Sequence, residues 1–195
     1  HATAYATIAY QTAYLKANYI REFLAAILSS EVGNTDKLVL YVRECDNFGV
    51  KVLPPDINES EGKFTVAGND IHFGRKAVKN VGAGAIDSVV KIREEGGRFK
   101  SIFDFCERVD LRLVNRRVIE SLIKCGAFDC HRIPRARLMA ASERALAVGQ
   151  RAQKDRMSGQ ISLFGSADFS ESGGEPGLYP EIPEWHEGKL LAFEK

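Results

Sequence analysis

The sequence predicts a mainly α-helical fold made of short helices, with one small β-hairpin and an extended C-terminal tail. Apolar residues recur at three- and four-residue spacings through most of the 195 residues, a pattern typical of amphipathic helices. Glycines and prolines interrupt that pattern often, so the helices are expected to be short. One stretch at about 63–74 alternates instead around a Gly-Asn turn, which predicts a two-stranded hairpin.

The first 74 residues are expected to hold two helices before this hairpin. Helical spacing runs from residue 4 to residue 29, and a tyrosine stripe on it is predicted to pack in a core: Tyr5, Tyr10, Tyr14 and Tyr19. The second helix should start with Thr35 as its N-cap and stop at Gly49. A double proline then predicts an extended connection in which Asp56 is a turn or helix-cap residue.

A run of short helices is predicted to follow, with a longer helix after them. The expected signals are a short helix over 75–80, a helix from about Ala85 to Gly96–Gly97, a cap at Ser101, a cap at Asn115 or Asp110, and a stop at Gly126. The long helix is expected over 134–158, with Pro134 in its first turn. The tail beyond it lacks periodicity and is interpreted as a mobile linker.

Composition and charge favour a globular chain that meets a polyanion. Apolar residues make up 45% and charged residues 27%. No apolar run approaches the roughly 18 residues of a membrane span, so we expect no membrane partner. The net charge is +1, but the positive charge is concentrated in one segment. Residues 75–137 carry 15 Lys and Arg against 8 Asp and Glu, while both flanking regions are net acidic. This basic segment would attract nucleic acid.

The stretch 77–90, AVKNVGAGAIDSVV, carries the most specific chemical signal. A tight turn at Gly82 and Gly84 is predicted to bring the backbone close to a ligand, because glycine has no Cβ. The first amides of the next helix lack acceptors and lie at the positive end of its dipole, so they would bind a phosphate. The candidate residues are Lys76, Lys79, Asn80, Val81, Gly82, Ala83, Gly84 and Ala85.

This stretch resembles the helix-hairpin-helix motif of DNA-binding proteins, whose hairpin usually reads Gly, an apolar residue, Gly. Here Asn80 replaces the first glycine, and asparagine is the residue that best tolerates positive φ after glycine. A second, weaker copy lies in LIKCGAFDCHRIPRARL, where the second hairpin glycine is absent. Its candidate DNA-binding residues are Lys124, Gly126, Arg132, Arg135 and Arg137.

No enzyme constellation is visible, so the chain alone is expected to be non-catalytic and to use no metal or cofactor. It has no Walker loop, no His-Glu pair at metal-binding spacing and no acidic pair on one hairpin that could hold two magnesium ions. The four cysteines form no CxxC pair and are expected to be reduced thiols. The chain opens without Met inside an apolar pattern, and we expect it to be part of a larger protein.

Blocks along the whole chain resemble the bacterial DNA polymerase III alpha subunit family and occur in that family's order. They are HATAYATIAYQTAYLKANYIREFLAAIL, VLPPDINES, FGRKAVKNVGAGAI, GGRFKSIFDFCERVD, NRRVIESLIKCGAFD and GQISLFG. The resemblance implies that 1–74 is the C-terminal part of the fingers region and 75–137 a tandem helix-hairpin-helix module. After the long helix, 159–165 would be a clamp-binding motif and 166–195 a linker towards an OB domain.

The same resemblance implies a division of labour within the parent protein. The parent would be a replicative C-family polymerase of the bacterial cytoplasm, adding deoxynucleotides with Mg²⁺ held by aspartates of a palm domain that is not in this chain. This portion would hold the double-stranded DNA backbone and contact the remaining domains. His1, Tyr5 and Lys16 match the family's fingers segment near the nucleotide, and we assign them no role.

The clamp-binding resemblance rests on a glutamine followed by a Leu-Phe pair. The residues are Gln160, Ile161, Ser162, Leu163 and Phe164. An extended segment would place Leu163 and Phe164 in an apolar pocket of the sliding clamp, with Gln160 hydrogen-bonded at the rim. The alternative is that the pair docks on the long helix of its own chain.

Two other functions stay open at the level of sequence. A helix-hairpin-helix repair enzyme, such as a base-excision glycosylase, would need a catalytic Lys or Asp after the hairpin, and Asp87 is the nearest candidate. A purely structural scaffold would use the basic segment only to pack against acidic surfaces of the parent, and it would bind no DNA.

Overall fold

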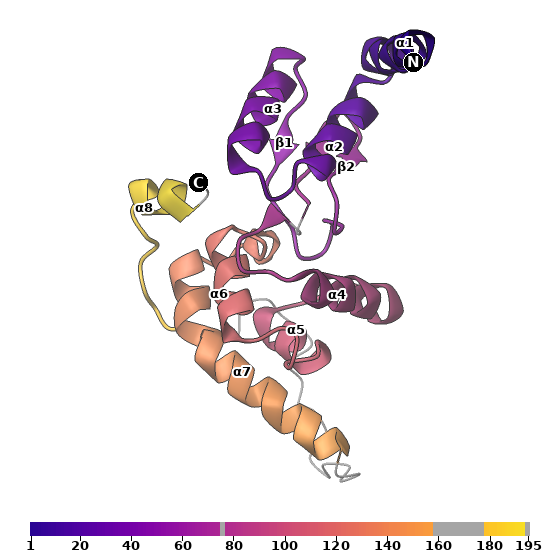
Figure 1. The fold of residues 1–195 in the computed structure, drawn as a ribbon. Helices are drawn as coiled ribbons and strands as arrows, with labels where there is room; N and C mark the ends of the chain where they lie inside the picture. The colour runs from indigo at the N-terminus through magenta and orange to yellow at the C-terminus, as the bar shows by residue number, and fades with distance from the viewer. Residues whose placement is uncertain (75–76, 158–177, 194–195) are drawn as a thin grey trace. The chain divides into compact units, whose positions relative to one another are not determined.

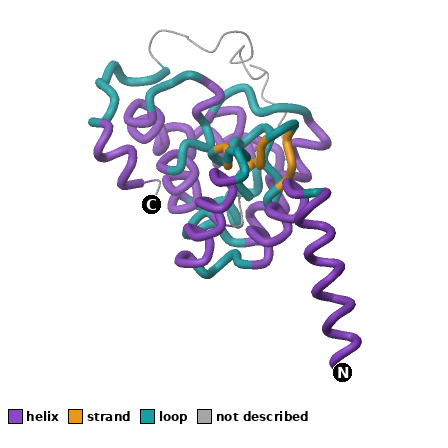
Figure 2. The backbone as a smooth tube through the Cα atoms, turned by 90° about the horizontal axis from the view of Figure 1, so that it is seen from above, coloured by secondary structure: helices purple, strands orange, loops and turns teal. Residues whose placement is uncertain are grey.

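The computed structural model describes residues 1–74, 77–157 and 178–193, which belong to two compact units (Figure 1). The first unit comprises His1–Pro54 and Ser60–Ala77, and the second comprises Pro55–Glu59 and Val78–Lys195. Helices make up most of the backbone in Figure 2 and the strands form one small group. The predicted mainly α-helical fold is therefore confirmed. None of the described helices is long and apolar enough to cross a membrane.

Three helices open the first unit: α1 (Ala2–Asn18), α2 (Ile20–Ser30) and α3 (Thr35–Asn47). The helix predicted for residues 4–29 is divided in two, because Tyr19 leaves helical geometry with φ −136° and ψ 55°. The predicted cap of α3 at Thr35 is wrong by one residue. The side chain of Asn34 caps this helix by accepting a hydrogen bond from the Lys37 N–H at 3.2 Å.

The tyrosine stripe of α1 is exposed, so the prediction that it packs in a core is wrong for this chain. Tyr5 and Tyr10 are 72% and 71% exposed, and Tyr14 and Tyr19 are about half exposed. No residue of α1 is buried. Helical spacing of aromatic residues identifies a face that can be covered, but it does not show which element covers it.

A small sheet completes the first unit. Its strands lie in the order β1 (Val52–Leu53), β3 (Asp70–His72), β2 (Thr65–Ala67). β2 and β3 form the predicted antiparallel hairpin, which turns at Gly68 with φ +62°. β1 joins β3 in parallel, with Val52 opposite Ile71, and the local sequence pattern does not predict this pairing. Ile71 is fully buried in one core cluster with Leu24 and Leu28 of α2.

The second unit consists of helices that follow one another at short intervals. They are α4 (Ala83–Gly96), α5 (Ile102–Arg108), α6 (Arg116–Lys124), the 3-10 helix η2 (Asp129–His131), α7 (Arg135–Met157) and α8 (Glu187–Phe193). Ser101 caps α5 and Asn115 caps α6, as predicted, since their side chains accept the N–H groups of Asp104 and Val118 at 3.1 Å. Gly97 ends α4 with φ +73°.

The core of the second unit lies where α5 and α6 pack on α7. Phe99, Phe105 and Phe128 are almost completely buried there and meet edge to face, with ring centroids 5.0 and 5.2 Å apart along the series. The segment 55–59 joins this core through the Ile57 N–H, which donates to the Ala127 carbonyl at 2.7 Å.

Candidate nucleic-acid interface

The first hairpin turns at Asn80, with φ +66°, and not at the two glycines that follow it. The prediction that asparagine supplies positive φ here is confirmed. The predicted tight turn at Gly82 and Gly84 is wrong, because Gly82 has φ −70° and ψ 152° as the N-cap of α4, and Gly84 lies within that helix. Of the predicted short helix over 75–80, Ala77 has 3-10 geometry, Val78 forms a bend, and Lys79 and Asn80 form a turn, so no α-helix is present over 77–80. Lys76 lies outside the described residues.

The N-terminus of α4 presents backbone donors. The N–H groups of Ala85 and Ile86 donate to the Gly82 carbonyl at 3.1 and 3.2 Å. The N–H groups of Ala83 and Gly84 have no acceptor among the residues that the structure describes. Both residues are exposed, so these two amides and the positive end of the helix dipole face solvent. Such an arrangement binds the oxygens of a phosphate.

Nothing in the described chain requires glycine at positions 82 and 84. A Cβ added to either residue would meet no atom within 4 Å, and neither residue has positive φ. The absence of a side chain at Gly82 and Gly84 leaves the backbone open on its solvent side, where a ligand can approach closely. The sequence predicted this open approach, although it assigned the turn to the wrong residue.

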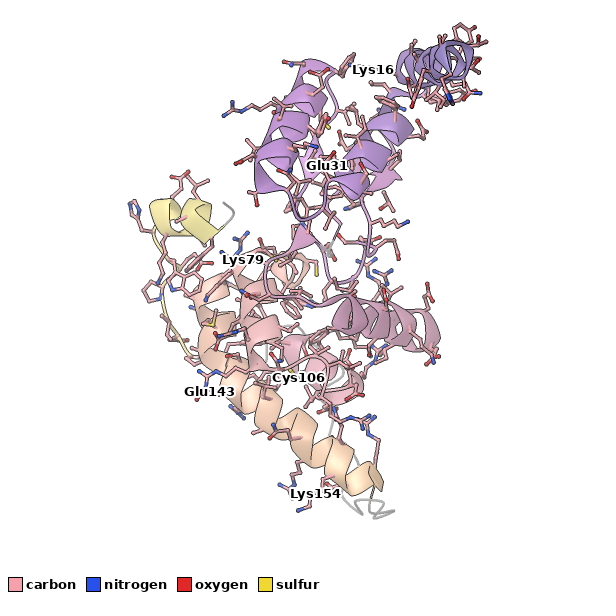
Figure 3. All side chains as sticks on the ribbon, in the orientation of Figure 1. Lys16, Glu31, Lys79, Cys106, Glu143 and Lys154 are labelled. Carbon is pink, nitrogen blue, oxygen red and sulfur yellow. The ribbon has the colours of Figure 1, made fainter. Side chains whose placement is uncertain are left out.

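The remaining candidates of the first hairpin divide into exposed and buried residues. Lys79, labelled in Figure 3, is exposed in the segment that precedes α4. Val81 and Ala85 are buried, together with the neighbouring Val78 and Ile86. These apolar side chains anchor the hairpin to its unit, so Val81 and Ala85 position the loop and only their backbone atoms are available to a ligand.

The second hairpin joins α6 to α7 through residues 125–134. Gly126 has φ +83°, and a Cβ on it would lie 2.7 Å from the Asp129 carboxylate and would also clash with the Arg135 guanidinium. The positive φ favours glycine at this position, and a side chain there would also displace the ends of Asp129 and Arg135. Arg132 has left-handed geometry with φ 57°, and its side chain is exposed.

Arg135 is a structural residue of this hairpin. It is 8% exposed, and its Nη2 lies 2.6 Å from Asp129 Oδ2 while its Nη1 donates to the Lys124 carbonyl at 3.0 Å. A guanidinium held in this way closes the loop between α6 and α7 and is turned away from an external phosphate. The Arg135 side chain is therefore not exposed for the DNA contact that the sequence predicted.

The C-terminal segment, residues 178–193, lies against the second hairpin, which the interpretation of the tail as a mobile linker did not anticipate. Glu184 accepts the N–H groups of Arg135 at 2.6 Å and Ala136 at 3.0 Å. Burial raises the pKa of Glu184, but these backbone donors, the Trp185 N–H and the Arg135 charge lower it more, so it lies below the usual range. No local pattern marks Glu184, because it lies 49 and 48 residues from the amides it meets.

The other two predicted cations of the second hairpin also contact the C-terminal segment. Arg137 Nε donates to the Ile182 carbonyl at 3.1 Å, and Lys124 Nζ lies 5.5 Å from the centre of the Phe193 ring. A cation that the sequence analysis missed is Arg117, exposed near the start of α6 and without a partner in the described part of the chain. The basic run at the Asn115 cap is the signal that could have identified it.

The residues that match the fingers segment lie in the first unit. Lys16 Nζ forms an ion pair with Glu44 Oε1 at 3.1 Å and lies 5.2 Å from the centre of the Phe48 ring. The hydrogen bond from Lys16 lowers the pKa of Glu44. His1 is exposed, and its carbonyl accepts the Tyr5 N–H.

Asp87 is exposed in the first turns of α4, whereas a glycosylase holds its catalytic group in an enclosed pocket for a flipped base. Within the described ranges, no group of three His, Cys, Asp or Glu residues could hold a metal ion. The four cysteines are free thiols. The predicted clamp-binding residues Gln160 to Phe164 lie outside the described residues.

Comparison with known proteins gives two findings. A family model described as a helix-hairpin-helix motif matches residues 49–138. Proteins named DNA polymerase III subunit alpha match the whole chain, with 43% identity in Saccharopolyspora erythraea, 43% in Pasteurella multocida and 41% in Vibrio cholerae. In each case the chain covers 17% of the relative's length, so it corresponds to about a sixth of those proteins.

Proposed function

The chain corresponds over its whole length to one segment of the bacterial DNA polymerase III alpha subunit family, and from this premise we propose that it is a non-catalytic portion that binds duplex DNA and docks on the sliding clamp. The parent would carry the polymerase activity, namely template-directed addition of deoxynucleotides with Mg²⁺ in a palm domain outside this chain. Its place of action would be the replisome in the bacterial cytoplasm.

The observation that carries the DNA-binding proposal is the open N-terminus of α4. Two solvent-facing amides, two glycines whose missing side chains leave free space, and the exposed Lys79 lie within six residues of one another. Backbone amides, helix N-termini and lysine side chains are the usual donors to phosphate oxygens, and such contacts carry no sequence information. The hairpin would therefore hold the duplex by its backbone regardless of sequence, as a polymerase needs when it moves along its product.

The basic charge of residues 75–137 supports the same proposal in a weaker form. Part of that charge is already paired, because Arg135 pairs with Asp129 in a partly buried contact and Arg116 pairs with Glu120 and Glu143 at the surface. The cations that remain exposed and without a described partner include Lys79, Arg117 and Arg132. These give a modest number of phosphate contacts, about two to four, and a matching salt dependence.

Fluorescence anisotropy with a labelled duplex tests the DNA-binding proposal. We expect affinity that is independent of sequence and a slope of roughly 2–4 in log K against log salt, for about that many phosphates. Lys79→Ala should weaken binding severalfold, while Lys91→Ala is the matched control because Lys91 is exposed on α4 and pairs with Glu95. Equal effects of the two substitutions, or no binding at low salt, would reject the hairpin as the site.

The clamp-docking proposal rests on the sequence pattern alone. Gln160 and the Leu163–Phe164 pair have the composition of a peptide anchor, in which two apolar side chains enter a pocket. Burying two such side chains contributes roughly 3–6 kcal/mol before the cost of ordering the segment. That range suits micromolar affinity, which allows a polymerase to be tethered and released.

A further inference from the structure

The N-terminus of α7 is already occupied by a carboxylate of the same chain. Glu184 Oε2 accepts the N–H of Arg135 and Oε1 accepts the N–H of Ala136, so the two oxygens meet the first two amides of the helix. These amides are the groups that would receive phosphate oxygens if the second hairpin bound DNA as the first is proposed to do. A carboxylate and a phosphodiester each present two oxygens and one negative charge to such a pair of donors.

The rest of the C-terminal segment reinforces this contact. The ring of Tyr179 packs edge to face on Phe103, with centroids 5.7 Å apart, and the Ile182 carbonyl accepts a hydrogen bond from Arg137. At the far end of the segment, Phe193 lies over Lys124. In Figure 1 the segment runs beside α7 and ends in α8. It therefore engages the amides and two of the cations of the second hairpin together.

We propose that Glu184 is an internal substitute for phosphate, so that the C-terminal segment and the DNA backbone compete for the N-terminus of α7. This inference rests on the proposed DNA-binding function and extends it to the second hairpin. The first hairpin is open in this structure, whereas the second is closed by Glu184. Displacement of the C-terminal segment frees the amides of Arg135 and Ala136 and the side chains of Lys124 and Arg137 at one step.

The segment has the properties of a displaceable occupant. Ile182, Pro183 and Glu184 are exposed, so water and ligands reach the contact from outside. The Glu184 carboxylate accepts its hydrogen bonds at the surface and not within a closed core. A DNA phosphate has the same charge as this carboxylate and can replace it. Neighbouring phosphates of the duplex would also engage Arg132, which the segment leaves exposed.

The test compares Glu184→Gln with Glu181→Gln in duplex binding by the full chain. Both substitutions remove one negative charge from the same exposed stretch, but Glu181 contacts neither amide of α7. Glu184→Gln should tighten duplex binding roughly threefold to tenfold and raise the salt slope by about 1, for one added phosphate contact. Equal affinities of the two variants overturn the inference.

Two further measurements separate this inference from the proposed function. Trp185, the one tryptophan in the sequence, lies in the C-terminal segment and reports its release. Acrylamide quenching of Trp185 should rise when the wild-type chain binds duplex, and it should be high in Glu184→Gln without DNA; no change in either case overturns the inference. Arg132→Ala should weaken binding more in the Glu184→Gln background than in the wild type.

The outcomes remain distinguishable. If the wild type binds duplex and Glu184→Gln and Glu181→Gln have equal affinities, the competition between Glu184 and phosphate is rejected, while the proposed DNA binding by the first hairpin stands. Absence of duplex binding by every variant, with circular dichroism showing retained helix, would reject the proposed function and the inference with it.

Discussion

The side chain of Asn58 pairs with both backbone groups of Phe99. Asn58 Oδ1 accepts the Phe99 N–H at 2.7 Å, and Asn58 Nδ2 donates to the Phe99 carbonyl at 2.9 Å. Asn58 is 8% exposed and Phe99 is 1% exposed. This pair ties residues 55–59 to the segment between α4 and α5, and so it supports the loop from which α5 starts.

Replacement of Asn58 by Ala should therefore destabilise the second unit. The buried N–H and carbonyl of Phe99 would lose their partners. Each such group costs roughly 1–3 kcal/mol, so we expect the free energy of unfolding to fall by about 2–6 kcal/mol. Urea unfolding followed by circular dichroism measures the change. Asn47→Ala is the control, since Asn47 is exposed and makes one weak contact at 3.4 Å. Similar midpoints for the two variants would show that the pair contributes little.

Gly84→Ala should separate stability from DNA binding. Position 84 lies in the first turn of α4 with free space around a Cβ, so alanine should stabilise the helix by about 0.5–1 kcal/mol. The added methyl group would stand beside the amides proposed to meet phosphate, and duplex affinity should fall roughly threefold to tenfold. Thermal unfolding and anisotropy on the same preparation provide both numbers. A more stable variant with unchanged duplex affinity would show that Gly84 does not lie in the DNA interface.

Thiol reactivity should depend steeply on pH. Cys130 is exposed at the surface, but partial desolvation, followed by the Asp56 charge, raises its pKa to about 11. Cys106 is buried, and burial raises its pKa to about 12. A raised pKa keeps the thiol protonated at pH 8, so alkylation in the folded chain should be slower by at least about 100-fold than in urea, where the pKa is roughly 8.5, and slowest at Cys106. The folded rate should rise about tenfold per pH unit up to pH 10.

Asp56→Asn provides the control for that measurement. It removes the negative charge beside Cys130 while an amide oxygen can still accept the Asn58 N–H that closes the turn. Peptide mass spectrometry should show faster labelling of Cys130 and unchanged labelling of Cys106. Equal labelling rates of each cysteine in the folded and urea-unfolded chains would contradict the raised pKa values on which this prediction rests.

The Leu163→Ala, Phe164→Ala double variant should lose binding to the sliding clamp by tenfold or more. Removal of both apolar side chains removes most of the roughly 3–6 kcal/mol expected from their burial. Fluorescence anisotropy with the cognate clamp measures the loss. Ser162→Ala, which keeps both apolar side chains, should bind as the wild type does, and duplex binding should be the same in all three proteins. Undiminished clamp binding by the double variant would place the docking site elsewhere.

The position of the first candidate hairpin could be predicted from the sequence, but which of its residues and of the second hairpin's residues are exposed could not. Glycines after Lys79 indicated an accessible helix N-terminus, and the structure shows one at α4. The pattern could not show that Arg135 is held by Asp129 or that Val81 is buried. A count of charges treats every arginine alike, whereas an internal ion pair removes one from the surface.

The sequence by itself determined the local features of this protein: the caps at Ser101 and Asn115, the stops at Gly97 and Gly126, and the hairpin around Gly68. Each depends on hydrogen bonds and dihedral preferences within a few residues, so the residue types at those positions are sufficient. Sequence similarity over the whole chain also identified the family.

Only the tertiary structure decided which distant groups meet. The parallel pairing of β1 with β3, the link between Asn58 and Phe99, and the carboxylate of Glu184 at the start of α7 join residues that are far apart in the chain, 41 apart for the Asn58 pair and 49 for Glu184 and Arg135. Their formation depends on how whole elements pack and on which polar groups that packing leaves to be satisfied. No periodicity or cap signal encodes that, because the partners are chosen by the fold as a whole.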